Sequence, residues 1–120
     1  MLDILKNNIF TTQGRLNRLR FLKYNLMLIF VGFVIFFVCG LIEGPENLEN
    51  SKMAYILSIP ISVAQVMSQI RRLHDLNKSG YFVLLAFVPV VNLLFELYLL
   101  FTKGTDGTNI YGYDPLLKDY

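Results

Sequence analysis

The chain has 120 residues, which is room for one small domain, and 54% of them are hydrophobic. A soluble domain of this length has too little interior to hide so much apolar surface, and the apolar residues are gathered in long runs, so the composition predicts a membrane protein. The net charge is only +2, and the single cysteine, Cys39, excludes an intrachain disulfide and a cysteine-rich metal site.

Residues 1–10 are predicted to form a short amphipathic helix. Leu2, Leu5 and Ile9 share one helical face, while charged and amide side chains lie on the other. This helix is too short to span a bilayer, so we expect it to lie in the membrane interface. The stretch that follows, residues 15–23, contains three arginines and a lysine.

Three hydrophobic segments of spanning length follow, at residues 22–42, 53–70 and 81–101. At about 1.5 Å per residue, helices of these lengths approach the ~30 Å thickness of the hydrocarbon layer. The pattern predicts an all-α integral membrane protein with one membrane domain over residues 1–120. It consists of an interfacial helix, three transmembrane segments and an ordered, turn-rich tail at residues 102–120.

The third segment is interrupted by Pro89 and Asn92 and carries one acidic residue, Glu96. A carboxylate inside a span costs on the order of 2.5–3.5 kcal/mol, so its position matters. The favoured interpretation is a single crossing with Glu96 near the outer interface. The alternative is a re-entrant hairpin that turns back at the proline, which would place the tail on the cytoplasmic side and bring Glu96 close to Gln69 and Arg72, in a buried ion pair.

The charge pattern predicts the orientation. Residues 1–23 and 71–80 are basic and are separated by two predicted spans, whereas the intervening residues 43–52 are acidic. Both basic regions therefore lie on one side, which the positive-inside rule makes cytoplasmic, together with the N-terminus.

A polar stripe runs along the second segment. Ser58, Ser62, Gln65 and Gln69 are spaced by four, three and four residues, which places them on one helical face. Polar groups that face lipid are costly, so we expect this face to pack against other helices.

The short connection at residues 71–80 should hold the second and third segments side by side. Asp75 and Ser79 are available to cap the start of the third segment. Asp75 lies among several cations that favour a nearby anion, so it is predicted to pair with an arginine from residues 15–20 or with backbone amides.

His74 and Asp75 together suggest acid–base chemistry. Adjacent residues do not face each other on a helix, however, and the chain has one histidine and no serine or cysteine elbow motif. The sequence therefore predicts no catalytic residue, metal site or cofactor. His74 is expected to be structural, with proton sensing as the alternative.

Three motifs are similar to those of a known family. GRLNRLRF at 14–21, RRLHDLNKSGYF at 71–82 and KGTDGTNIYGYDP at 103–115 resemble the small bacterial inner-membrane proteins of unknown function typified by YhaH. The motifs occur in the same order and cover nearly the whole chain. The resemblance implies a bacterial inner-membrane location and no particular activity.

The leading functional hypothesis is a non-enzymatic module that binds a partner protein or anionic lipid headgroups through a basic cytoplasmic collar. The candidate residues for this role are Arg15, Arg18, Arg71, Arg72, His74, Asp75 and Lys78. The plainer interpretation is that these cations only set the topology. The alternative function is an oligomeric small-solute or ion transporter or channel built on the polar stripe, which requires self-association because three short spans cannot enclose a pore. Nucleic acid is not an expected partner, since the cations adjoin the membrane.

Overall fold

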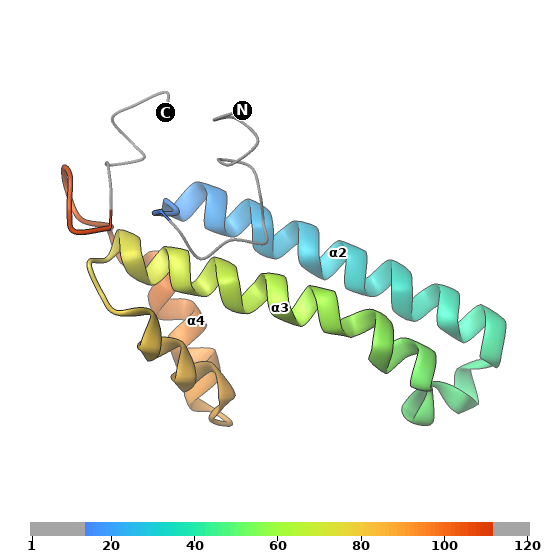
Figure 1. The fold of residues 1–120 in the computed structure, drawn as a ribbon. Helices are drawn as coiled ribbons and strands as arrows, with labels where there is room; N and C mark the ends of the chain where they lie inside the picture. Colours follow the sequence, from blue (N-terminus) through green and yellow to red (C-terminus); the bar gives the residue numbers. More distant parts are fainter. Residues whose placement is uncertain (1–13, 112–120) are drawn as a thin grey trace.

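A computed structural model describes residues 14–111, in which two long antiparallel helices are joined at one end to a shorter helical hairpin (Figure 1). The elements are α2 (Arg18–Glu43), the 3-10 helix η1 (Pro45–Asn50), α3 (Lys52–Asp75), the 3-10 helix η2 (Gly80–Phe87) and α4 (Val91–Phe101). All regular elements of this range are helical, as predicted. The interfacial helix expected at residues 1–10 lies outside the described residues, as do residues 112–120.

Helix α2 begins and ends with recognisable caps. The Asn17 side chain accepts a hydrogen bond from the backbone N–H of Arg20 at 2.8 Å, which satisfies one of the free amides of the first turn. At the other end Gly44 adopts φ 92°, and its N–H donates to the carbonyl of Gly40. A positive φ favours glycine at such a helix end.

Helix α3 is longer than the sequence predicts. It is capped by Ser51, whose hydroxyl accepts from the N–H of Ala54, and continues through Asp75, five residues beyond the predicted end at residue 70. Basic residues in its last turn favour this extension, because cations are stabilised near a helix C-terminus. The RRLHD sequence is thus the end of α3 rather than a loop, and the reversal follows at Asn77, which has φ 59°.

Both α2 and α3 are long and apolar enough, by length and composition, to cross a membrane. In each helix only 17% of the most apolar stretch is buried, so most of its hydrophobic side chains point outward. Long helices whose apolar side chains are largely uncovered are typical of a chain surrounded by lipid.

The third apolar segment is not one spanning helix. It divides into η2 and α4, which are joined by residues 88–90 and lie side by side in Figure 1. Pro89 has no N–H to donate and disfavours helical backbone before it, and Val90 has φ 69°, so the chain reverses here. The favoured single crossing is therefore wrong for this segment, and the hairpin alternative describes the structure. At 11 residues, α4 is too short to span a bilayer.

The hydrophobic core lies where the hairpin meets the first turn of α2 and the last turns of α3. Seven buried apolar residues form it: Leu16, Phe21, Leu73, Leu76, Val83, Phe95 and Leu99. The fold thus concentrates its packing at one end, which also contains the first two sequence motifs and residues 103–111 of the third. The Ser79 hydroxyl accepts from the N–H of Tyr81 at 3.2 Å, so the predicted Ser79 cap of the third segment is confirmed. Asp75 does not cap this segment, because its carboxylate bonds to two arginines.

The hairpin makes a prediction about accessibility. In a chain with Cys39 replaced by alanine, cysteines at Lys78 and Thr108 should react alike with an impermeant thiol reagent. Both positions are exposed and lie at the end of the α2–α3 pair to which the hairpin is joined, hereafter the hairpin end. A cysteine at Asn47 in η1 should behave in the opposite way, since α2 and α3 separate the two ends. Opposite labelling at positions 78 and 108 in intact cells would show that the third segment crosses the membrane.

Candidate functional site

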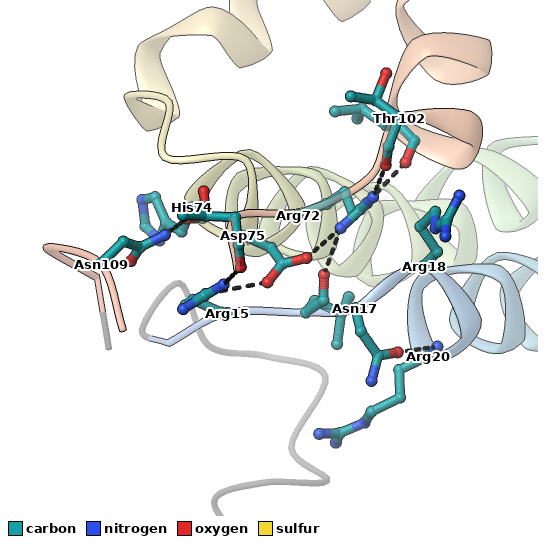
Figure 2. Close-up of polar contacts among 12 residues, drawn as sticks. Arg15, Asn17, Arg18, Arg20, Arg72, His74, Asp75, Thr102 and Asn109 are labelled. Atoms are coloured by element: carbon teal, nitrogen blue, oxygen red, sulfur yellow. Dashed lines mark hydrogen bonds and ion pairs between the residues drawn. The ribbon is translucent and has the colours of Figure 1, made fainter. Parts of the chain in front are cut away.

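The side chains of Arg15, Arg72 and Asp75 form an ion cluster at the hairpin end (Figure 2). The Nε of Arg15 donates to Oδ1 of Asp75 at 3.0 Å, and Nη1 of Arg72 donates to Oδ2 at 2.5 Å. All three residues are buried, with exposed fractions of 1%, 0% and 3%. Asp75 therefore pairs with an arginine from residues 15–20, as the sequence predicts, and also with one from its own helix.

Two guanidinium groups share one carboxylate, so their remaining N–H groups need neutral acceptors. Arg72 meets this need with three backbone carbonyls. Its Nε donates to the carbonyl of Leu99 at 2.7 Å, its Nη1 to that of Leu16 at 3.1 Å, and its Nη2 to that of Thr102. These bonds hold the end of α4 and the chain that enters α2 against α3.

Arg15 makes the corresponding contacts with the tail. Its Nη1 and Nη2 donate to the carbonyls of Gly107 and Thr105, both at 2.6 Å. The N–H of Thr105 in turn donates to the backbone carbonyl of Asp75 at 2.7 Å. Gly104 lies so close to the Asp75 carboxylate that a Cβ at this position would overlap it. This part of the tail therefore lies against the ion cluster. The sequence predicts only turns here and does not indicate that Gly104, Thr105 and Gly107 contact the cluster.

His74 lies at the edge of the cluster and is half-buried. Its Nδ1 lies 3.2 Å from the carbonyl of Gly14, which accepts only, so this nitrogen carries the proton. The imidazole stacks on the Tyr111 ring with 4.1 Å between ring centres, and the Asn109 side chain donates to the His74 carbonyl at 2.9 Å. Like the ion cluster, these contacts connect the first motif, the second motif and the tail.

The residues predicted to form the basic collar separate into two groups. Arg15, Arg71 and Arg72 are buried, and the Arg71 guanidinium lies 5.9 Å from the centre of the Tyr24 ring. Arg18 and Lys78 are exposed, although Arg18 also donates to the carbonyl of Phe101 at 3.3 Å. Burial removes the first group from any surface that a ligand reaches, so only the second remains available for binding.

The polar stripe on α3 is likewise partly buried and partly exposed. Gln69 is buried and its Nε2 donates to Oε2 of Glu96 at 2.9 Å, as the hairpin alternative predicts. The ion pair between Glu96 and Arg72 that it also predicts is not formed, because Arg72 pairs with Asp75. Gln65 is half-buried, but Ser58 and Ser62 are exposed, against the expectation that the whole stripe packs on helices. The hairpin covers only the last turns of α3. Ser58 tolerates exposure because its hydroxyl donates to the carbonyl of residue 55 at 2.7 Å.

The cluster is suited to holding chain segments together rather than to chemistry on a substrate. Both oxygens of Asp75 bond to guanidinium groups, and the arginines bond to backbone carbonyls of three different segments. A buried carboxylate engaged in this way is not available to accept a proton from a ligand. The structure thus gives the three motifs a common role in assembling one end of the molecule.

Comparison with known proteins gives a family but no activity. A family model described as "Protein of unknown function (DUF805)" matches residues 9–113. The Escherichia coli (strain K12) inner membrane protein YhaI is 40% identical over 114 residues, which cover 95% of this chain and 92% of the relative. Inner membrane protein YhaH of the same strain is 30% identical over 125 residues, which cover 98% and 96%. No solved structure matches. These matches confirm the resemblance indicated by the three motifs.

Removing the shared carboxylate should destabilise the protein. Asp75→Ala leaves two buried guanidinium groups without their anion, a change that costs about 3–5 kcal/mol in buried ion pairs. The matched control is Asp106→Ala, which breaks the exposed pair with Lys103 and should cost no more than about 1 kcal/mol. Thermal unfolding in detergent, followed by the helical circular dichroism signal, measures both. Equal melting temperatures for the two variants would contradict the role of Asp75.

A second variant tests the tail. Gly104→Ala places a methyl group against the Asp75 carboxylate, so the tail must move away and weaken the Arg15 contacts. Limited proteolysis of the folded protein should then cut within residues 102–111 faster than in the wild type. Gly107→Ala is less suitable as a control because Gly107 has φ 76°, whereas Thr108→Ala at an exposed neighbouring position should leave the cutting rate unchanged.

Proposed function

This chain belongs to the DUF805 family of proteins of unknown function, and from that premise we propose that it is a non-enzymatic inner-membrane module that binds anionic phospholipids at its basic end. The membrane location is supported by the two relatives, which are named inner membrane proteins. It is also supported by two helices of spanning length whose apolar side chains are mostly uncovered.

The orientation follows from the two ends of the helix pair. The η1 end carries Glu43, Glu46 and Glu49 with one lysine, whereas the hairpin end is rich in arginine and lysine. The positive-inside rule places the hairpin end, and with it the chain entering α2, on the cytoplasmic side. In this arrangement η2 and α4 enter the membrane from the cytoplasmic side and return to it.

The observation that carries the proposal is the excess of exposed positive charge at the hairpin end. Arg18, Lys23 and Lys78, hereafter the surface cations, are exposed there. The acids described at this end do not offset them, because Asp75 is buried between two arginines and Asp106 pairs with Lys103. Juxtamembrane cations gain roughly 1 kcal/mol each near an anionic membrane surface, so three of them favour acidic headgroups over neutral ones.

In this proposal the buried arginines are not the binding residues. Arg15 and Arg72 use their N–H groups on Asp75 and on backbone carbonyls. A phosphate would have to displace these contacts, and the buried acid would then lose its counterions. The buried ions therefore maintain the shape of the hairpin end, and the surface cations bind lipid.

A second candidate is the oligomeric transporter or channel. It is favoured by a groove of about 370 Å³ between α2, α3 and η2, which is lined in part by Ser62, Gln65 and Gln69, with Glu96 bonded to the last of these. The groove opens to the side, so a second copy must supply the other wall. Proteoliposomes that contain this chain alone and show no flux of monovalent ions or small polar solutes would exclude this candidate.

Anionic lipid should stabilise the protein through the surface cations. Adding phosphatidylglycerol to the detergent-solubilised protein should raise its melting temperature more than phosphatidylcholine does, because a ligand that binds the folded state stabilises it. The triple variant Arg18→Gln, Lys23→Gln, Lys78→Gln should lose most of this difference, and added salt should reduce it in the wild type. Lys103→Gln, whose charge is already paired with Asp106, is the control. Equal stabilisation of the wild type by the two lipids would refute the proposal.

A further inference from the structure

A mostly apolar groove lies between the two arms of the hairpin. Its volume is about 360 Å³, which is within the ~300–1,000 Å³ that small-molecule sites occupy. Its walls come from η2, α4 and the end of α3, and include Leu73, Phe82, Leu85 and Leu94. Lys78 and Tyr98 are the polar side chains of the lining.

The two polar side chains lie at the same end of the groove. Lys78 precedes η2, and Tyr98 lies near the end of α4, which Arg72 fastens to the last turn of α3. The turn of the hairpin, at residues 88–90, lies at the opposite end (Figure 1). The groove is thus polar at its mouth and apolar in its depth.

We propose that this groove binds one acyl chain of an anionic phospholipid whose headgroup lies against Lys78. The inference rests on the proposed function and assigns it a site. A lipid of the cytoplasmic leaflet has its headgroup at the level of the surface cations and its chains directed toward the bilayer centre. The hairpin has the same direction, from Lys78 at the membrane surface to the turn at residues 88–90 within the hydrocarbon layer.

Charge complementarity selects the anionic headgroup. Lys78 is exposed, and within residues 14–111 no carboxylate pairs with its ammonium group. Its backbone is fixed, because its N–H donates to the carbonyl of Leu73 at 2.8 Å, one residue of the groove wall. An ammonium group at the mouth of an apolar groove matches an amphiphile with a negative head, and Tyr98, the other polar residue of the lining, has a hydroxyl that can donate.

The apolar walls select an acyl chain as the occupant. Phe82, Leu85 and Leu94 lie on the hairpin that enters the membrane, and they are 50%, 42% and 64% exposed. Other protein atoms therefore leave much of these groove walls uncovered. A flexible hydrocarbon chain fills such a groove without leaving any polar group unpaired in the hydrocarbon layer. A water-filled groove would be costly against these side chains.

The test uses the full-length protein in detergent with equal amounts of phosphatidylglycerol and phosphatidylcholine, and native mass spectrometry counts the lipids that remain bound. The wild type should retain one phosphatidylglycerol in preference to phosphatidylcholine. Lys78→Gln should lower this preference about fivefold, the factor that one juxtamembrane cation implies. Leu94→Trp should fill the groove and reduce retention of either lipid.

Two control variants match these changes. Lys103→Gln removes a paired cation outside the groove, and Leu97→Trp enlarges an exposed apolar residue of α4 that does not line it. Both should retain phosphatidylglycerol as the wild type does. Lysophosphatidylglycerol should compete for the site, whereas glycerol phosphate, which has the charge but no chain, should not.

The outcomes separate the site from the function. If the wild type prefers phosphatidylglycerol but Lys78→Gln and Leu94→Trp behave as their controls do, lipid binding stands and the groove is not its site. If glycerol phosphate competes as well as the lysolipid, the acyl chain is not what the groove holds. If the wild type retains both lipids equally, the proposed function fails and this inference fails with it.

Discussion

The carboxylate of Asp75, shared by two buried arginines, is the interaction on which the rest of the structure depends. A buried guanidinium is costly unless its charge is paired and each of its nitrogens donates to an acceptor. Arg15 and Arg72 meet both conditions through Asp75 and through backbone carbonyls of the tail, of α4 and of the chain entering α2. Three segments far apart in the sequence are thereby held at one end of α3.

This arrangement accounts for the path of the hairpin. An apolar segment that is interrupted by proline can cross the membrane or return, and its hydrophobicity does not decide between the two. The carbonyls of Leu99 and Thr102 bond to Arg72, so the end of α4 lies beside the last turn of α3 and the tail continues over Asp75. The return also brings Glu96 to Gln69, which gives the intramembrane carboxylate a hydrogen-bond partner.

Much of this end could be predicted from sequence, for identifiable physical reasons. Charge counting locates Asp75 among cations, and the serine before an apolar run indicates a cap at Ser79; both are confirmed. Charge counting could not show that Arg15 and Arg72 are buried, because arginines beside a membrane span are ordinarily placed at the headgroup level. It could not reveal the carbonyl acceptors either, since every residue carries one and only the fold selects Thr105 and Gly107. The exposure of Ser58 and Ser62 could not be predicted either, because the sequence does not show how little of α3 the hairpin covers.

The most direct test of the account is a double-mutant cycle between Arg15 and Asp75. Thermal unfolding in detergent is measured for Arg15→Ala, for Asp75→Ala and for the double variant, and the losses of stability are compared. The shared carboxylate predicts strong coupling, of the order of 0.5–3 kcal/mol, so the double variant should lose clearly less than the sum of the two single variants. Additive losses would mean that the two residues act independently, and would contradict the claim that this ion cluster joins the segments.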